Sequence, residues 1–173
     1  MKTLTLLRHA KSGWDDMNLR DFDRRLNPKG KRAATVMGRH MRDANLAFDR
    51  VVASPAVRVV ETLDGVASGY GRTLAPVWDK RLYLAAASTL LDVVHELAPE
   101  HDRVLLVGHN PGLEDLVLLL AADAGEAADK YPTATLAELT IGDAWTDASE
   151  GKAELVRFVR PRDLDPVLGP DEE

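Results

Sequence analysis

The stretch Thr3-Leu4-Thr5-Leu6-Leu7-Arg8-His9-Ala10-Lys11-Ser12 decides how the rest of this 173-residue sequence is interpreted. Its first half, residues 3–7, is a short apolar run rich in Leu and Thr, which predicts a buried strand. The strand ends at two cationic side chains, Arg8 and His9. Because ligands of an open α/β sheet bind beyond the carboxyl ends of its strands, we expect both side chains at the edge of a binding crevice.

The composition is that of an ordinary globular protein, and the length suits one domain with a sizeable core. A formal net charge of −6 argues against nucleic acid or an anionic membrane as a partner, since both favour a basic surface. There is no cysteine, which excludes a disulfide framework, a thiolate metal site and a cysteine nucleophile. The first apolar run is too short for a signal peptide or a membrane span, so we expect a cytoplasmic protein.

Strand-like and helix-like segments alternate through most of the chain. Short apolar runs typical of strands occupy residues 3–7, 48–53, 73–77 and 103–107. Segments with helical periodicity follow them, beginning at Pro28, at Pro55, just after Ser88 and at Leu113. This alternation predicts an α/β fold in which a mainly parallel central sheet is covered by helices on both faces, as a three-layer α/β/α sandwich. Residues 133–141 and 153–159 predict a final strand pair with antiparallel pairing at one edge.

Polar residues before three of these helices predict where the helices begin. Asn27 precedes Pro28 as an expected N-cap, and Ser54 precedes Pro55 in the same way. Ser88 is the third expected cap. The segment 11–27 shows neither helical nor strand periodicity and is crowded with Asp and Arg, so we expect a surface loop with a short helical turn at most.

The carboxyl ends of three predicted strands carry the candidate site residues, which are Arg8 with His9, Ser54 with Arg58, and His109 with Asn110. In a parallel sheet all three ends open on the same edge. Two arginines and two histidines would repel one another there unless an anion bound among them. The planar fork of Arg matches the oxygens of a phosphate, and a helix starting near Pro111 would add N–H groups. The pattern predicts a phosphate pocket.

A histidine beside a bound phosphate can act as a nucleophile. Neighbouring cations lower its pKa and keep the imidazole neutral, and a neutral ring nitrogen can attack phosphorus. A second histidine, if protonated, would stabilise the charge that develops during transfer, and water would hydrolyse the phosphohistidine intermediate. Because the arginines neutralise the phosphate, we expect neither a metal nor another cofactor.

Three motifs resemble the histidine phosphatase superfamily: Leu7-Arg8-His9-Ala10, Ser54-Pro55-Ala56-Val57-Arg58 followed by Glu61-Thr62, and Val107-Gly108-His109-Asn110-Pro111. Ala10 is typical of its SixA-type phosphohistidine phosphatase branch, whereas most of the superfamily has Gly there. Residues 21–30 and 160–164 also resemble that branch. The resemblance implies a phosphoglycerate mutase-like fold in which His9 is the nucleophile. It also implies that Ser54 lies near the pocket and that the phosphoryl group is held by Arg8, Arg58 and His109.

Composition and the position of the polar loop after His9 set the expected domain limits and the outer substrate contacts. Residues 1–160 are expected to form a single histidine phosphatase domain, and residues 161–173 a loose acidic tail containing proline. We expect Arg24, in the polar loop that follows His9, at the lip of the substrate site. The full set of expected substrate-binding residues is Ser54, Asn110, Lys11 and Arg24.

One departure from the family pattern bears on the substrate. Many relatives that act on alkyl phosphates place a glutamate general acid after the third strand, whereas residues 78–88 offer only Asp79 before the helix. An alkoxide leaving group needs a proton, but cleavage of phosphohistidine releases an imidazole, which is a far weaker base. The missing glutamate favours a phosphohistidine substrate, although four loop carboxylates could substitute for it: Asp15, Asp16, Asp21 and Asp23.

Three functions therefore remain open. The first is a metal-independent phosphatase that removes phosphate from a protein histidine, such as that of a histidine phosphotransfer protein, through an intermediate on His9. The second is a phosphomonoesterase for a small phosphorylated metabolite, and the third is a non-catalytic phosphate- or phosphoprotein-binding module. The chain lacks long insertions that would enclose a small substrate, and a binding module has no need of a nucleophile. Both points favour the first function.

Overall fold

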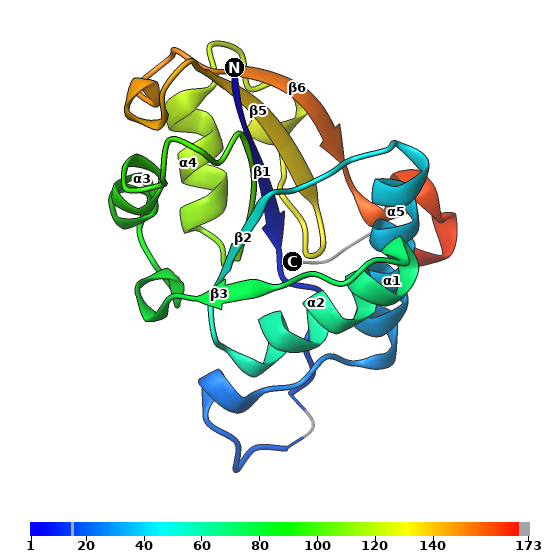
Figure 1. Cartoon of the computed structure of the whole chain (residues 1–173). Coiled ribbons are helices and arrows are strands. Elements are labelled where there is room, and N and C mark those ends of the chain that lie inside the picture. The colour runs from blue at the N-terminus through cyan, green and yellow to red at the C-terminus, as the bar shows by residue number, and fades with distance from the viewer. Residues whose placement is uncertain (15, 170–173) are drawn as a thin grey trace.

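Six strands form one central sheet in the computed structural model, which describes residues 1–14 and 16–169 (Figure 1). The strands are β1 (Lys2–Arg8), β2 (Arg50–Ala53), β3 (Pro76–Trp78), β4 (Arg103–Gly108), β5 (Leu136–Gly142) and β6 (Glu154–Val159). Their order is β3-β2-β4-β1-β5-β6. The first four strands are parallel, and β5 is antiparallel to both β1 and β6. The predicted parallel sheet with an antiparallel edge is confirmed, with β5 lying second from that edge.

Helices cover both faces of this sheet, as the three-layer prediction requires. They are α1 (Pro28–Asp43), α2 (Val57–Tyr70), α3 (Ala87–His95), α4 (Gly112–Leu120) and α5 (Pro161–Leu164). Figure 1 shows α1 and α2 on one face and α3 and α4 on the other. None of the helices in the described part of the chain is long and apolar enough to cross a membrane.

The two faces of β1 belong to two separate apolar cores. Leu4 and Leu6 are fully buried together with residues of α3 and α4, whereas Leu7 packs with residues of α1 and α2. Successive side chains of a strand point to opposite faces, so a strand covered on both sides must be apolar at nearly every position. The continuous apolar run at residues 3–7 is therefore the direct consequence of the three-layer architecture.

The helix starts agree with the sequence in one case and differ in two. Asn27 caps α1 as predicted, because its Oδ1 accepts the Gly30 N–H at 2.8 Å. The predictions for Ser54 and Ser88 are wrong: α2 begins at Val57, and α3 begins at Ala87 without a side-chain cap. Because α2 starts three residues later than the position of Ser54, the Ser54 hydroxyl is available for another contact.

The start of α1 packs directly against the backbone that follows His9. A Cβ at Gly30 would lie 2.1 Å from the Lys11 carbonyl oxygen, so only glycine permits this approach. The same carbonyl accepts the Asn27 N–H at 3.0 Å. The first turn of α1 thereby fixes the path of the chain just beyond the end of β1.

The C-terminal segment differs from the loose tail that the sequence predicts. Residues 161–169 form α5 and a short 3-10 turn that pack against α1. Leu168 is buried, and the Asp165 carboxylate accepts from the Arg32 guanidinium at 2.6 Å. The apolar side chains of this short segment, though few, are placed on one side and meet α1. The rest of the predicted tail, residues 170–173, lies outside the described residues.

Candidate active site

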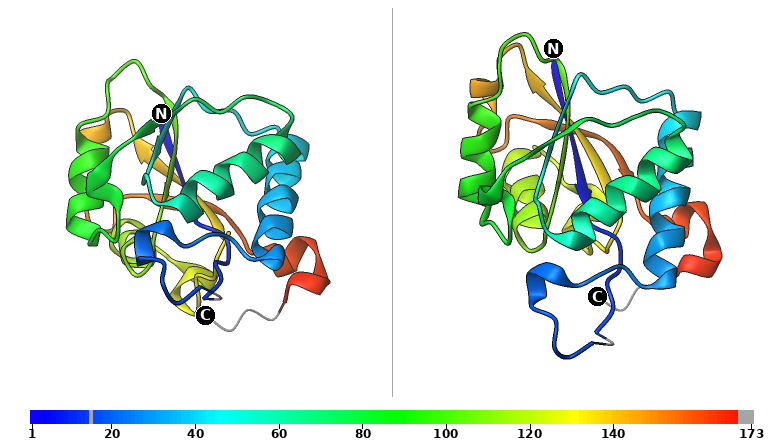
Figure 2. Two further views of the ribbon diagram at one scale, coloured as in Figure 1. Left: turned by 90° about the horizontal axis from the view of Figure 1, so that it is seen from below. Right: turned by 60° about the horizontal axis from the view of Figure 1, so that its bottom comes forward.

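The register of the sheet brings three strand ends to one level. Arg8 at the end of β1 pairs with Gly108 at the end of β4, and Ala53 of β2 is level with Val107. The next residues leave the sheet side by side: His9 N–H donates to the Gly108 carbonyl at 3.1 Å, and Ser54 N–H donates to the Val107 carbonyl at 3.0 Å. Figure 2 looks onto this end of the sheet, with the loop that follows β1 lying across it.

His9 is buried, and its hydrogen bond to the backbone shows which of its two ring nitrogens carries the proton. Its Nδ1 lies 2.7 Å from the Ala10 carbonyl, which can only accept, so Nδ1 carries the proton. In the neutral ring Nε2 is then the unprotonated nitrogen. Burial lowers the pKa of His9 well below its ordinary value, and the nearby His109, Arg8 and Arg58 lower it further. His9 is therefore a neutral imidazole with an available lone pair at physiological pH.

His109 faces His9 across the site, with ring centroids 5.2 Å apart. Its Nε2 lies 2.8 Å from the Ser54 hydroxyl, and its Nδ1 lies 3.4 Å from the Arg58 Nη2. Because the guanidinium only donates, Nδ1 is the acceptor and Nε2 carries the proton. Burial and the Arg58 charge lower the pKa of His109 to about 3. The sequence allowed for a protonated His109, but with this pKa the ring is neutral at physiological pH.

Arg58, from the first turn of α2, is almost completely buried between the two histidines and the loop after β1. One edge of its guanidinium binds Asp21: Nη1 donates to the Asp21 carbonyl at 2.7 Å, and Nη2 donates to Oδ2 at 3.0 Å. Its Nε is also buried and has no hydrogen-bond partner within the described residues. An orphaned buried donor costs free energy, so the Nε edge is suited to receive a ligand oxygen.

Asp21 is the site residue that sequence reasoning placed least well, since it was only one of four loop carboxylates. Burial would raise the pKa of its carboxyl, but the hydrogen bond from the Tyr83 hydroxyl and the charge of Arg58 outweigh this and lower the pKa to about 2. Arg24 adds a second ion pair, with Nη2 at 3.1 Å from Oδ1. Asp21 is therefore ionised and held from three directions.

Tyr83 is a further contact that the sequence did not indicate. It lies in the segment between β3 and α3, where many relatives that act on alkyl phosphates have a glutamate. Its ring packs edge-on against that of His109, with the ring centroids 5.4 Å apart. Its hydroxyl donates to Asp21, and both burial and this carboxylate raise the pKa of Tyr83. A single tyrosine in the sequence does not indicate a functional site, because tyrosine is as common in an apolar core as in an active site.

Three further predicted site residues, Arg8, Asn110 and Arg24, bond to segments around the site. The Arg8 guanidinium donates to the Tyr131 carbonyl at 3.1 Å, and the Asn110 amide donates to the same carbonyl at 2.9 Å. Arg24 lies over the Trp14 ring at 3.6 Å and donates to the Ser12 hydroxyl at 2.6 Å, which places it in the loop as expected. These contacts tie the loop and residue 131 to the rim of the site.

Two expected contributors to the site stay predictions. Lys11 lines a small hollow with Lys29 and Thr133 at the start of α1, and within the described residues it makes no hydrogen bond or ion pair with the two histidines or Arg58. The N–H groups of the second and third residues of α4 bond within the turn that precedes the helix. Leu113 donates to the His109 carbonyl at 3.0 Å, and Glu114 donates to Asn110 Oδ1 at 3.2 Å. These two groups stabilise the turn rather than a bound anion.

Comparisons with known proteins agree with this geometry. The family model of the histidine phosphatase superfamily (branch 1) matches residues 4–83, which hold the first two motifs. An uncharacterised protein of Mycobacterium tuberculosis is 35% identical over 164 residues, covering 90% of this chain and 100% of that protein. The chain belongs to the histidine phosphatase superfamily. The motif around His109 lies outside the matched range, and the fold alone brings it beside the other two.

Solved structures place this histidine phosphatase superfamily member near the SixA proteins. A candidate phosphohistidine phosphatase SixA from Nakamurella multipartitia is 31% identical with a TM-score of 0.79, covering 92% of this chain and 96% of that one. A candidate SixA from Agrobacterium tumefaciens is 29% identical with a TM-score of 0.77, covering 92% and 98%. The resemblance to the SixA-type branch and the phosphoglycerate mutase-like fold are both confirmed.

We expect the neutral state of His9 to set the acid limb of the pH–rate profile. The pKa of His9 in the folded protein lies below the ordinary 6.5, so the ring stays unprotonated as the pH falls through 6.5. The acid limb of kcat/KM, corrected for ionisation of the substrate, should therefore fall below pH 6.5. A limb centred at or above pH 6.5 would show that the nucleophile is not this buried imidazole.

We also expect Asp21→Asn to destabilise the protein because it leaves the buried Arg58 charge without its counter-ion. Since Asp21 is 40% exposed, solvent screening reduces the loss in unfolding free energy to about 1–2 kcal/mol. The folded pKa of about 2 lies below the ordinary 3.8, so this stabilisation is complete above pH 4 and disappears as the pH falls to about 2.

Urea unfolding of Asp21→Asn and Asp23→Asn provides the test. Asp23 lies in the same turn but pairs with Arg20, whose side chain is exposed, so its replacement should change the unfolding free energy little. Equal losses in the two variants, or a difference between Asp21→Asn and the native protein that persists at pH 2, would contradict the role of Asp21.

Proposed function

We propose that this protein is a metal-independent phosphohistidine phosphatase that transfers the phosphoryl group to His9 Nε2 and then to water. The assigned tautomer of His9 supports this proposal, since it leaves the attacking nitrogen unprotonated without any prior proton transfer. The orphaned Nε of Arg58 and the half-buried guanidinium of Arg8 offer donors for the phosphoryl oxygens.

The choice between phosphohistidine and an alkyl phosphate as substrate depends on the ionised state of Asp21. Within the described residues, Asp21 is the carboxylate that bonds to Arg58, and no carboxylate bonds to His9 or His109. With a pKa of about 2 it holds no proton to give at neutral pH. An alkyl phosphate would have to expel an unprotonated alkoxide from such a site, whereas phosphohistidine can leave as a neutral imidazole.

The proposed reaction has two steps. The lone pair of His9 Nε2 forms a bond to phosphorus while the P–N bond to the substrate imidazole breaks, and that imidazole takes its proton from solvent. A water molecule then attacks phosphorus from the side that the substrate imidazole has left, opposite His9. The P–Nε2 bond breaks, and inorganic phosphate leaves with His9 restored. Arg8 and Arg58 stay charged throughout and stabilise the equatorial oxygens in both steps.

A small-molecule phosphomonoesterase is the second candidate, and burial of the site favours it. His9 is 6% exposed, and His109 and Arg58 are each 2% exposed, so only a slender group can reach them. An imidazole side chain presented by another protein is also slender, and the segment between β3 and α3 supplies no glutamate. We therefore rank the protein phosphohistidine first.

A substrate panel separates the candidates. The panel contains a histidine phosphotransfer domain phosphorylated on histidine, free phosphohistidine, p-nitrophenyl phosphate and phosphoserine, each assayed with and without EDTA. We expect turnover of both phosphohistidine substrates at rates far above those for phosphoserine, with no loss in EDTA. Faster turnover of phosphoserine would favour the phosphomonoesterase, and binding of phosphate without any turnover would favour the binding module.

A further inference from the structure

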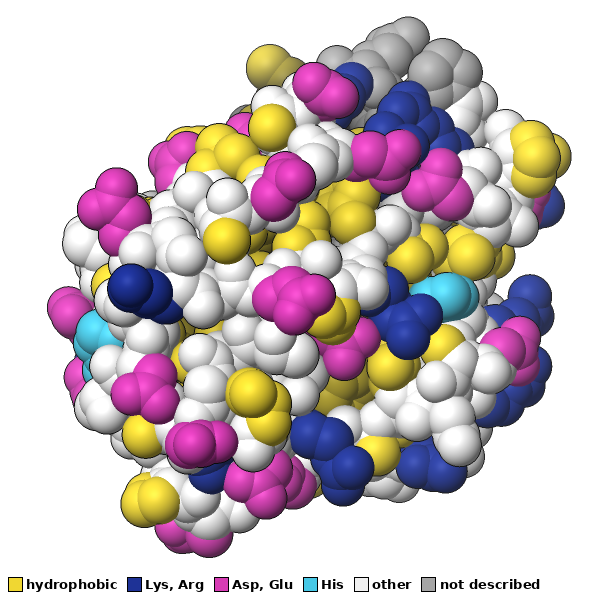
Figure 3. All heavy atoms as spheres, turned by 90° about the horizontal axis from the view of Figure 1, so that it is seen from above, with side chains coloured by type: hydrophobic (Ala, Val, Ile, Leu, Met, Phe, Trp, Pro, Cys, Tyr) yellow, Lys and Arg dark blue, Asp and Glu magenta, His cyan; other side chains and the backbone are white. Residues whose placement is uncertain are grey.

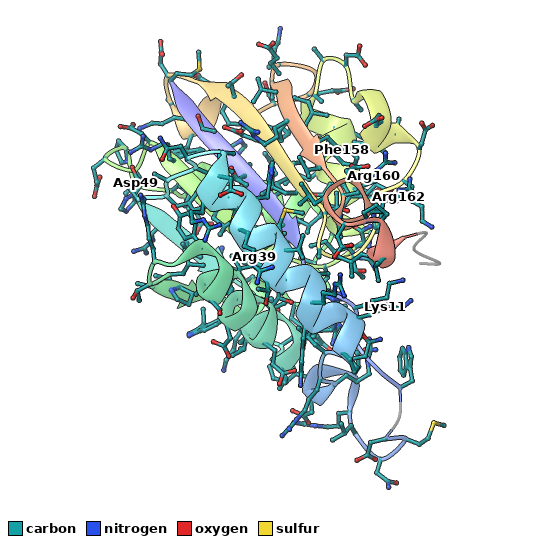
Figure 4. The ribbon with its side chains drawn as sticks, turned by 90° about the vertical axis from the view of Figure 1, so that its right-hand side faces the viewer. Lys11, Arg39, Asp49, Phe158, Arg160 and Arg162 are labelled. Atoms are coloured by element: carbon teal, nitrogen blue, oxygen red, sulfur yellow. The ribbon has the colours of Figure 1, made fainter. Side chains whose placement is uncertain are left out.

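A basic surface lies beside the candidate site on a protein whose net charge is −6. The outer side of α1 and the adjoining segments carry five cations, which we name the basic strip: Lys11, Lys29, Lys31, Arg39 and Arg162. Figure 4 shows Lys11, Arg39 and Arg162 on the same side of the molecule. Figure 3 views the end of the molecule opposite the candidate site, and there too Lys and Arg gather toward the right, the side on which α1 and α2 lie, whereas acidic side chains predominate on the left.

The members of the basic strip differ from their neighbours in lacking counter-ions. Nearby Arg32 pairs with Asp165 at 2.6 Å, and Arg42 pairs with Asp43 at 3.2 Å. None of the five strip cations has an ion pair with another described residue. Unpaired cations held close together raise the local positive potential, which attracts an anionic partner.

The surface between these cations is hollowed and partly apolar. Lys31 and Arg39 line a shallow groove between α1 and α5. Val36 forms part of its floor, and the groove continues past Leu164. From Lys29 to Arg39 the helix rises about 15 Å, much more than the width of one phosphate group. An extended groove with charged walls and apolar floor suits a protein surface better than a small anion.

The groove begins next to the nucleophile. Lys11 and Lys29 line the hollow at the start of α1 together with Thr133. The residue after Thr133 donates its N–H to the His9 carbonyl at 2.9 Å. A partner that inserts a phosphorylated side chain at His9 would therefore bring its surrounding surface over this end of the basic strip.

We propose that the basic strip docks an acidic surface of the phosphorylated protein substrate, with its phosphohistidine directed to His9. This inference rests on the proposed function, and it adds where the substrate protein binds and what charge its surface carries. The strip accelerates encounter with an acidic partner and orients it, while the chemistry stays with the buried residues. A free small substrate has no surface to place there and is indifferent to the strip.

The double variant Lys31→Glu/Arg39→Glu tests the docking surface, because both side chains are exposed and neither belongs to the candidate site. The matched control is Arg72→Glu/Lys152→Glu, which reverses two exposed cations outside the strip. Two probes are used at low and high salt: an acidic histidine phosphotransfer domain phosphorylated on histidine, and free phosphohistidine. The affinity of each variant for the unphosphorylated domain is measured in parallel.

We expect the strip variant to lose about tenfold in kcat/KM and in affinity for the domain at low salt, and less at high salt. Its turnover of free phosphohistidine should equal that of the native protein, and the control should match the native protein throughout. Equal behaviour of strip and control variants would overturn the docking proposal. The docking proposal would also be overturned if the strip variant bound the domain as the native protein does but lost self-association or binding to anionic vesicles, since the strip would then serve another partner. Failure of the native protein to hydrolyse either phosphohistidine would instead overturn the proposed function, while the affinities still decide the docking surface.

Discussion

His9→Ala is expected to lower turnover of phosphohistidine by at least about 10⁴-fold while leaving the fold intact. The variant removes the nitrogen that is proposed to accept the phosphoryl group, and the neighbouring donors cannot replace a nucleophile. Because His9 is buried as a neutral ring, its loss should not leave an uncompensated charge in the interior. Steady-state assays with free phosphohistidine, together with circular dichroism and thermal unfolding, measure both effects.

His40→Ala is the matched control for this experiment. His40 is also partly buried, and burial is the main cause of its lowered pKa. It lies on α1, however, and makes no contact with His9. We expect its replacement to leave turnover within about twofold of the native value. Near-native activity of His9→Ala would remove His9 from the nucleophilic role whatever the control shows.

Arg58→Ala is expected to weaken binding of vanadate about 10- to 100-fold, which corresponds to loss of one or two charge-assisted hydrogen bonds. Arg58 is buried at the centre of the site, its Nε has no hydrogen-bond partner among the described residues, and its other edge is held by Asp21. Isothermal titration with vanadate gives the affinity directly and does not depend on the identity of the substrate.

Since Arg58→Ala leaves Asp21 without its main partner, the variant could be poorly folded, and Arg58→Lys is the companion variant. Lysine keeps the charge but lacks the planar fork that can serve Asp21 and a phosphoryl oxygen together, so we again expect weakened vanadate binding. Arg20→Ala, which removes an exposed arginine of the same loop, should bind vanadate normally. Native affinity in Arg58→Lys and Arg58→Ala would show that the anion binds elsewhere.

The strands and the edge of the sheet that carries the site were predictable from the sequence for one physical reason. Strands buried on both faces must be apolar throughout, so runs such as residues 3–7 and 103–107 stand out from the surrounding chain. Parallel strands also direct their carboxyl ends to one edge, which is why the sequence alone predicts that His9, Ser54 and His109 meet.

Caps and loop contacts were less predictable because they depend on tertiary partners. A serine followed by proline suits a helix start, but the hydroxyl of Ser54 lies beside the Nε2 of His109. Asp21 and Tyr83 come from segments without periodicity, and nothing local shows that they will meet over Arg58. The density of Asp and Arg in residues 15–25 is the one signal in this part of the sequence, because a loop that carries both charges directly after His9 can supply a counter-ion to the cations of the site.

The prediction of a loose C-terminal tail is wrong for residues 161–169 because a low apolar fraction does not exclude packing. In residues 161–169, two apolar side chains on one side, Leu164 and Leu168, suffice to pack the segment against α1. Asp165 adds an ion pair with Arg32. Composition averages over a segment, whereas docking needs only a few side chains at the right spacing.

A crystal structure of the vanadate complex is the most direct test of the claim that His9 is the phosphoryl acceptor. Vanadate adopts the geometry of the phosphoryl transition state, so its metal atom reports which nitrogen attacks. The account predicts vanadium bonded to His9 Nε2, with its equatorial oxygens accepting hydrogen bonds from Arg8 and the Nε edge of Arg58. Vanadium bonded to His109, or bound away from both histidines, would contradict it.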